Sequence, residues 1–105
     1  MSLLEPDNSN QVVRILDENP DVVLYFTGQS CGACRSLTPN LPKIVNRYEG
    51  LVFAKVDSSE CDKLMDICNV TALPTFVMFR NGREVKRSIG ANLKNIINDI
   101  DSAYL

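Results

Sequence analysis

Apolar residues gather in short runs along the chain, and polar stretches separate these runs. The run at residues 22–27 is rich in β-branched and aromatic side chains, which predicts a strand buried on both faces. Residues 51–56 form the next such run and predict a second strand. A short edge strand is expected at residues 2–5.

A hairpin is expected in the last third of the chain. Residues 75–80 predict a strand, and the Asn81-Gly82 pair that follows is typical of a type I′ turn. Residues 83–89 should therefore return antiparallel to that strand. Four basic side chains are expected to form a solvated face of this hairpin: Arg80, Arg83, Lys86 and Arg87.

Helical spacing of apolar residues predicts helices between the strands. The first helix is expected to begin at a cap within Asp7-Asn8-Ser9 and to end at Asn19-Pro20. Its apolar face consists of Val12, Ile15 and Leu16. The last helix is expected to follow a cap at Asn92 and to bury Leu93, Ile96, Ile97 and Ile100.

Two further helices are expected in the middle of the chain. One follows Cys31 and should be kinked at Pro39 and distorted again at Pro42, because proline removes a helical hydrogen bond. Its apolar positions are Leu37, Leu41, Ile44, Val45 and Tyr48. The other is short, should be capped by Ser58-Ser59, and presents one face made of Cys61, Leu64, Met65 and Cys68.

Strands that alternate with helices and end in a hairpin predict an α/β domain with a mixed sheet and helices on both faces. The 105 residues suit a single domain over residues 1–105, and the net charge of −2 argues against general nucleic-acid binding. Residues 1–7 show no signal-peptide features, and no segment approaches membrane-spanning length. We therefore expect a cytoplasmic protein that is monomeric and binds neither nucleic acid nor membrane.

The main candidate for chemistry is the pair Cys31 and Cys34, which follows the strand at residues 22–27. Three residues of helical rise span about 4.5 Å, a distance that suits a disulfide. The first cysteine would lie where unpaired backbone N–H groups favour a thiolate, the form that attacks disulfides. A C-x-x-C motif near a βαβ pattern therefore predicts dithiol–disulfide exchange.

Other uses of the cysteines are less favoured by their spacing. Gly32 at a strand–helix junction argues against Cys31 and Cys34 as plain core residues. A zinc site would need Cys61 and Cys68 as well, but their C-x6-C spacing is too wide for a structural zinc knuckle. An iron–sulfur cluster shared by two chains through the first pair stays open as an alternative.

The chain resembles thioredoxins over nearly its whole length. The resemblance rests on motifs in a fixed order: Cys31-Gly32-Ala33-Cys34, Pro39, Ala72-Leu73-Pro74-Thr75, Asn81-Gly82 and Ile89-Gly90-Ala91. Val56-Asp57 and the Cys61/Cys68 pair are most similar to animal cytosolic thioredoxins. The resemblance implies a thioredoxin fold, with a central mixed sheet of four to five strands flanked by four helices.

The resemblance also implies roles for individual residues. Cys31 would be the exposed nucleophile, Cys34 the buried resolving thiol, and Pro74 a cis proline that faces them. Gly32 and Ala33 would form the active-site turn. The substrate groove would be lined by Ser30, Leu73, Pro74, Ile89, Gly90 and Ala91. Disulfide-containing proteins would be the substrates, and a thioredoxin reductase would supply electrons from NADPH, with no cofactor and no metal bound to this chain.

Three residues depart from the family pattern Trp-Cys-Gly-Pro-Cys and its buried aspartate. Ser30 replaces the tryptophan, Ala33 replaces the proline, and Tyr25 stands six residues before Cys31 where the family has the aspartate. Because tyrosine is a poor base at neutral pH, we expect slower turnover than in an ordinary thioredoxin. Lys55 lies where the family often has a lysine under the dithiol, and it would favour the thiolate.

Cys61 and Cys68 are expected to pack in the core as small apolar residues. Animal thioredoxins are thought to use the matching pair for oxidative regulation, so these two are also candidate regulatory thiols. Seven residues of intact helix would hold them about 10 Å apart, too far for a disulfide. At a further regulatory cysteine of the family this chain has Ala72, which excludes a disulfide-linked dimer through that position.

Two functional hypotheses follow besides cluster binding. The first is a thiol–disulfide oxidoreductase that reduces protein disulfides and serves cell redox homeostasis. The second is a binding adaptor with a thioredoxin fold and little turnover, which Ser30, Ala33 and Tyr25 would favour.

Overall fold

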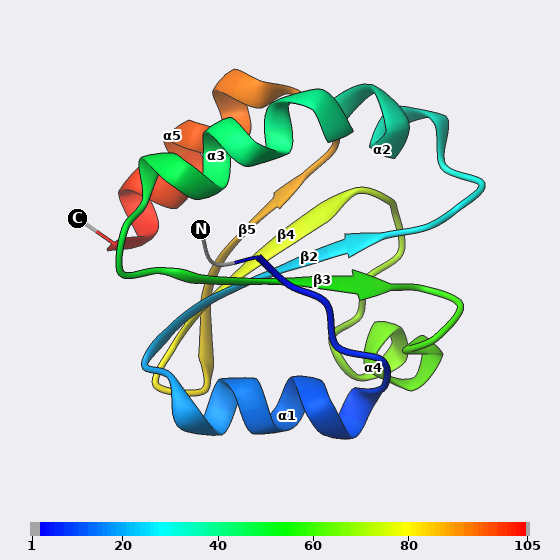
Figure 1. The fold of residues 1–105 in the computed structure, drawn as a ribbon, viewed down its shortest axis with the longest axis vertical. Coiled ribbons are helices and arrows are strands. Elements are labelled where there is room, and N and C mark those ends of the chain that lie inside the picture. The colour runs from blue at the N-terminus through cyan, green and yellow to red at the C-terminus, as the bar shows by residue number, and fades with distance from the viewer. Residues whose placement is uncertain (1–2, 105) are drawn as a thin grey trace.

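A computed structural model describes residues 3–104, in which five strands form one sheet between two layers of helices (Figure 1). The strand order is β1-β3-β2-β4-β5. Strands β1, β3 and β2 run parallel, whereas β4 is antiparallel to β2 and β5 is antiparallel to β4. The predicted mixed sheet is confirmed. The strands are β1 (Leu3–Leu4), β2 (Asp21–Thr27), β3 (Val52–Asp57), β4 (Thr75–Arg80) and β5 (Arg83–Ile89).

The central strand β2 is buried along residues 22–27, as its sequence predicted. At the sheet edge, residues 3 and 4 of the predicted strand 2–5 pair with Phe53 and Ala54 of β3. Residue 5 is not part of that strand, and residue 2 lies outside the described residues. β2 therefore lies between β3 and β4, and the chain leaves its carboxyl end toward Cys31.

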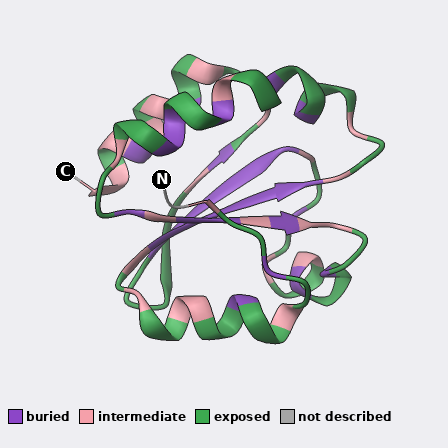
Figure 2. Cartoon of the chain, in the orientation of Figure 1, coloured by how far each residue is buried: buried purple, intermediate pink, exposed green. Residues whose placement is uncertain are grey.

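Helices cover both faces of the sheet, and the central strands carry most of the buried residues (Figures 1 and 2). One face is covered by α1 (Ser9–Glu18) and α4 (Asp62–Ile67). The other face is covered by α2 (Gly32–Leu37), α3 (Leu41–Arg47) and α5 (Leu93–Tyr104). The four phenylalanines of the chain are all buried: Phe26, Phe53, Phe76 and Phe79. No helix within the described residues is long and apolar enough to cross a membrane.

Two predicted helix caps are present. The Asn8 side chain accepts a hydrogen bond from the Gln11 N–H at 3.0 Å and begins α1. The Asn92 side chain accepts one from the Asn95 N–H at 3.0 Å and begins α5. Both bonds satisfy a backbone donor that the first helical turn leaves unpaired.

The helix expected after Cys31 is broken into two helices rather than only kinked. α2 ends at Leu37, a 3₁₀ turn follows at Thr38–Asn40, and α3 begins at Leu41. Pro39 lies in the 3₁₀ turn, where its missing N–H ends the regular bonding pattern. The distortion expected at Pro42 is wrong, because Pro42 lies in the first turn of α3. The N–H groups of a first helical turn have no partner within the helix, so a proline there removes no hydrogen bond.

The cap predicted at Ser58-Ser59 is also wrong. The Asp57 carboxylate accepts both the Ser59 N–H at 2.8 Å and the Ser59 hydroxyl at 2.6 Å, which makes a turn. α4 begins only at Asp62, and Cys61 occupies the capping position without a side-chain bond. Cys61 and Cys68 therefore flank α4 rather than lie together within it.

The hairpin has the predicted geometry. Asn81 and Gly82 have φ values of 53° and 79°, and β5 returns antiparallel to β4. Positive φ at both central residues is the mark of a type I′ turn. The Asn81 N–H also donates to the Pro20 carbonyl at 2.7 Å, which ties this turn to the start of β2.

Candidate active site

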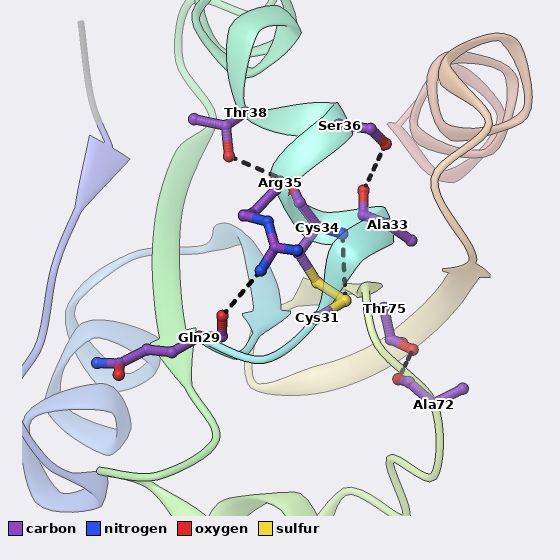
Figure 3. Close-up of a disulfide and its surroundings, with 9 residues drawn as sticks. All are labelled: Gln29, Cys31, Ala33, Cys34, Arg35, Ser36, Thr38, Ala72 and Thr75. Carbon is purple, nitrogen blue, oxygen red and sulfur yellow. Dashed lines mark hydrogen bonds between the residues drawn. A yellow bond between two sulfur atoms is a disulfide. The ribbon is translucent and has the colours of Figure 1, made fainter.

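Cys31 and Cys34 form a disulfide at the start of α2, where the chain leaves the carboxyl end of β2 (Figure 3). Cys31 has extended backbone angles and caps the helix, while Cys34 lies in its first turn. Their Cα atoms are 5.2 Å apart, within the range that a disulfide needs. The C-x-x-C motif therefore lies at the strand–helix junction that the sequence predicted.

The two sulfur atoms differ in environment. The Cys31 Sγ accepts a hydrogen bond from the Cys34 N–H at 3.1 Å and the residue is half-buried. Cys34 is only 3% exposed. In the reduced protein the same N–H would stabilise a Cys31 thiolate, because hydrogen bonds to a charged form favour that form. The geometry thus provides one accessible sulfur atom and one sheltered sulfur atom.

The turn between the cysteines is open to solvent. Gly32 and Ala33 are exposed, and the Ala33 carbonyl accepts the Ser36 hydroxyl at 2.7 Å. Arg35 extends back along the turn and donates from Nη1 to the Gln29 carbonyl at 3.4 Å (Figure 3). A guanidinium therefore lies beside the loop that carries Cys31.

The predicted groove residues from two other segments lie together. The Leu73–Pro74 peptide bond is cis, as the resemblance implied, and the Thr75 hydroxyl donates to the Ala72 carbonyl at 2.7 Å. The Pro74 carbonyl accepts the Gly90 N–H at 2.9 Å, which joins this segment to the end of β5. Ile89 at that end is 64% exposed.

Tyr25 and Lys55 are neighbours in the parallel register of β2 and β3. Tyr25 is buried, whereas Lys55 is partly exposed and lies 3.8 Å from the Glu5 carboxylate. Both residues line a cavity of about 360 Å³ that Cys34 also lines. The structure therefore brings the two predicted tuning residues to the sheltered side of the dithiol.

Sequence reasoning did not assign a site role to Ser58 and Ser59. They line a second cavity, of about 340 Å³, together with Ser30 and Cys31. Their position after β3 was a usable signal, because the carboxyl ends of parallel β2 and β3 meet at the same edge of the sheet. Asp57 sits at this edge too, and the bonds from Ser59 lower the pKa of its carboxyl.

Cys61 and Cys68 are free thiols that pack against α1 and the sheet. Cys61 is buried and Cys68 is half-buried, so burial raises the pKa of both thiols. Arg87 donates to the Cys68 carbonyl at 2.8 Å and holds that end of α4 against β5. Within residues 3–104, no three or more His, Cys, Asp or Glu side chains are grouped to hold a metal ion.

The sequence pattern of the Thioredoxin family matches residues 2–102. This chain belongs to the thioredoxin family. The mitochondrial thioredoxin-3 of Saccharomyces cerevisiae is 32% identical over 91 residues, which are 87% of this chain and 72% of that protein. The putative thioredoxin-5 of Dictyostelium discoideum is 36% identical over 98 residues, 89% of this chain and 93% of that protein.

Solved thioredoxins share the fold as well. The Trypanosoma brucei brucei thioredoxin has a TM-score of 0.89 at 29% identity, over 96% of this chain and 89% of that one. Thioredoxin NaTrxh of Nicotiana alata has a TM-score of 0.90 at 25% identity, over 96% and 91%. The predicted thioredoxin fold is confirmed, with α2 and α3 counted as one interrupted helix.

Family membership and the Cys31–Cys34 pair at disulfide distance together identify the activity. The protein is a thiol–disulfide oxidoreductase that reduces protein disulfides. The adaptor and iron–sulfur hypotheses are not favoured by these findings.

Proposed function

We propose that Cys31 is the nucleophile and Cys34 the resolving thiol of this thioredoxin. The observation that supports this assignment is the contrast between the two sulfur atoms. The Cys31 Sγ is accessible and accepts the Cys34 N–H, whereas Cys34 is 3% exposed and its thiol stays sheltered until a mixed disulfide forms. Exposure and a stabilised thiolate are what an attacking thiol needs.

The reaction follows from these two positions. The Cys31 thiolate attacks one sulfur of a substrate disulfide, and the other substrate sulfur leaves as a thiolate. Cys34 then loses its proton and attacks the Cys31 Sγ, which releases the second substrate thiolate. The protein is left with the Cys31–Cys34 disulfide, the form present in the structure. Two electrons pass from the dithiol to the substrate.

A groove around the dithiol would hold the substrate's extended segment. Its proposed walls are Ser30, Leu73, Pro74, Ile89, Gly90 and Ala91. Support comes from the hydrogen bond that joins Gly90 to Pro74 and from the exposed Ile89 side chain at the end of β5, which is available for apolar contact. An extended peptide would pair with the peptide groups next to Pro74 that this bond does not use, in the manner of β-addition.

The proposed physiological cycle needs an external reductant. A thioredoxin reductase that uses NADPH would return the Cys31–Cys34 disulfide to the dithiol, so the chain carries electrons and contributes to cell redox homeostasis. We further propose that residues 1–105 act as one monomeric domain in the cytoplasm, where the free thiols Cys61 and Cys68 would stay reduced. Cell fractionation tests the compartment, since one relative is named as mitochondrial.

The first experiment is reduction of insulin with dithiothreitol as electron donor. Wild-type protein should accelerate precipitation of the insulin B chain, and Cys31→Ser should remove that acceleration. A Ser102→Ala variant, changed at an exposed position of α5, is the matched control. Equal rates for wild type and Cys31→Ser would overturn the assignment.

A second experiment separates the roles of the two cysteines. Cys34→Ser should accumulate a stable mixed disulfide between Cys31 and a substrate, because the resolving attack is missing. Mass spectrometry of the trapped species identifies the bonded cysteine. A trapped bond at any cysteine other than Cys31 contradicts the proposal.

A further inference from the structure

The Cys34 thiol must lose its proton to attack the Cys31 sulfur atom, and the structure restricts where that proton can go. Cys34 is 3% exposed, so bulk solvent does not reach its thiol directly. A substrate bonded to Cys31 covers the outer side of the pair. On the inner side, Cys34 lines the cavity of about 360 Å³ between the sheet and the helices α2 and α3. The proton therefore leaves through this cavity.

The cavity is suited to hold water. Its volume is larger than one water molecule needs, and it reaches the surface at Glu5, whose side chain is 70% exposed. The Thr27 hydroxyl lines it, and the Thr38 hydroxyl, which also lines it, donates to the Cys34 carbonyl at 3.1 Å (Figure 3). Both hydroxyls can bond to water. Water in the cavity would therefore connect the Cys34 thiol with groups nearer the surface.

Few of the side chains around the cavity can accept a proton. Within the described residues, five titratable or charged side chains line it besides Cys34: Glu5, Tyr25, Arg35, Lys55 and Asp57. The residues of α3 that line it are all apolar. A guanidinium and an ammonium already carry their protons at neutral pH, and a phenol is a poor base there. The two carboxylates are therefore the candidate acceptors.

The carboxylates of Asp57 and Glu5 differ in how far they are already bonded. The Asp57 Oδ1 accepts the Ser59 N–H at 2.8 Å and the Ser59 hydroxyl at 2.6 Å, and these bonds lower the pKa of the carboxyl. A carboxylate stabilised in this way is a weaker proton acceptor. Within residues 3–104, the Glu5 carboxylate accepts no hydrogen bond, and the Lys55 Nζ lies 3.8 Å from its Oε1. Glu5 is therefore the better acceptor.

Glu5 is held beside the cavity by the residues around it. It follows the edge strand β1, which pairs with β3. Pro6 is buried, and a residue that precedes proline is restricted to an extended backbone. On its outer side Glu5 shares a smaller cavity of about 150 Å³ with Lys55 and with three further carboxylates: Asp7, Asp57 and Glu60. The Glu5 carboxylate therefore stays near the opening of the larger cavity although its side chain is exposed.

We propose that Glu5 accepts the Cys34 proton through water in this cavity when Cys34 resolves the mixed disulfide. The proposal rests on the proposed function, since it requires Cys34 to be the resolving thiol. As the proton passes to the Glu5 carboxylate, the Cys34 Sγ bonds to the Cys31 Sγ and the bond between Cys31 and the substrate sulfur breaks. The substrate leaves as a thiolate, the dithiol is oxidised, and Glu5 returns the proton to solvent.

Reaction of the reduced protein with the aromatic disulfide DTNB separates the two chemical steps. Stopped-flow absorbance follows two releases of thionitrobenzoate. The first depends on the DTNB concentration and reports attack by Cys31, whereas the second does not and reports resolution by Cys34. Mass spectrometry of the quenched product confirms the Cys31–Cys34 disulfide. Glu5→Gln should slow the second step about tenfold at neutral pH, less than a directly bonded base would, and should leave the first step unchanged.

The pH profile separates proton transfer from a structural effect. In Glu5→Gln the rate of the second step should rise about tenfold per pH unit between about pH 6 and 8, because the thiolate fraction of Cys34 then limits it. Wild type should rise less steeply, because an ionised carboxylate removes the proton at each of these pH values. The difference between the two proteins should therefore shrink toward about pH 9.

Replacement of the lost carboxylate gives a second readout. Glu5→Asp should keep most of the wild-type rate of the second step. Glu5→Ala leaves room for a small carboxylate, so added acetate should accelerate its second step and should not accelerate that of wild type. Glu18→Gln removes a carboxylate from an exposed position of α1 that does not line the cavity, and this matched control should equal wild type in both steps.

The outcomes separate this proposal from the proposed function. A second step as fast in Glu5→Gln as in the Glu18→Gln control would overturn the role of Glu5, and so would a pH slope equal to that of wild type. Slowing by Asp57→Asn and not by Glu5→Gln would give the role to Asp57 instead. If Cys34→Ser still shows a second step that is independent of the DTNB concentration, the proposed function is wrong and this proposal is wrong with it.

Discussion

The Tyr25 ring stacks on the Phe76 ring with centroids 4.7 Å apart and an interplanar angle of 18°. The two residues are paired across β2 and β4, and both are buried. Tyr25 also lines the cavity on the sheltered side of Cys34. An aromatic side chain fixed by stacking thus occupies the place from which a carboxylate could accept the Cys34 proton.

Resolution of the mixed disulfide should depend little on the Tyr25 hydroxyl. Tyr25→Phe retains the stacked ring, so we expect an unchanged resolution rate. Tyr25→Asp supplies a base and should raise that rate at neutral pH, at a loss of about 3 kcal/mol or more in the free energy of unfolding. Rapid-quench kinetics of a preformed mixed disulfide and urea unfolding measure the two effects.

Tyr48→Phe, at a tyrosine outside the two cavities beside the cysteines, is the control for these kinetics. A resolution rate more than about threefold slower in Tyr25→Phe than in this control would show that the Tyr25 hydroxyl takes part in the reaction. A Tyr25→Asp rate equal to wild type would show that another group already accepts the Cys34 proton.

Local signals were sufficient for the elements that carry the cysteines. The apolar run at residues 22–27 was enough to predict the buried strand there. The Asn81-Gly82 pair was enough to predict a turn with positive φ at both residues. The Ser58-Ser59 cap failed because the adjacent Asp57 carboxylate is a stronger acceptor for the Ser59 donors. The sequence pattern alone does not show which of two nearby hydrogen-bond arrangements, the serine cap or the Asp57 turn, will form.

The site was predictable where it is contiguous in the chain and not where it depends on strand pairing. Cys31 and Cys34 were found from their spacing. The cavity between Ser30 and Ser58 depends on parallel pairing of β2 with β3, which brings residues 28 positions apart to one edge of the sheet. Gly28 is likewise crowded by side chains from two other loops, since a Cβ atom there would lie 2.9 Å from the Ser58 Oγ and 3.0 Å from the Leu73 Cδ1.

The Tyr104 hydroxyl should contribute measurably to stability. It lies 3.1 Å from the Val22 carbonyl and 2.9 Å from the Phe79 carbonyl, residues that pair across β2 and β4. Tyr104→Phe removes the donor and should lower the free energy of unfolding by about 1 kcal/mol. Urea unfolding measures this change. Insulin reduction should be unaffected because Tyr104, at the end of α5, contacts the start of β2, whereas the cysteines follow the other end of that strand. A variant as stable as wild type would show that solvent replaces the lost bond.

The two free thiols should react slowly and at different rates in the oxidised protein. Burial raises the pKa of both Cys61 and Cys68, so little thiolate is present at neutral pH. Cys68 is half-buried and should be alkylated by iodoacetamide before the fully buried Cys61. The alkylation rates of both thiols should increase with pH and should still be increasing above about pH 9. Peptide mapping by mass spectrometry distinguishes the sites, and faster labelling of Cys61 is the contrary result.

The Tyr48 hydroxyl makes stability depend on pH in the alkaline range. It donates to the Asp101 carboxylate at 2.7 Å, and burial together with this bond raises the pKa of Tyr48 to about 12. The folded state therefore holds the proton more tightly than the unfolded state, where a tyrosine ionises near about pH 10. The contribution of Tyr48 to stability is complete below that pH and is lost as the pH rises toward the folded-state value.

Tyr48→Phe should remove this part of the pH dependence. The variant is expected to lose less free energy of unfolding than wild type between about pH 9 and pH 12, by on the order of 1 kcal/mol, since solvent screens a partly exposed group. Urea unfolding at a series of pH values gives the comparison, and absorbance of the ionised phenol follows the titration directly. The same loss in both proteins would contradict the assignment to Tyr48 and would leave the alkaline transition to the other groups whose pKa burial raises, Tyr104 among them.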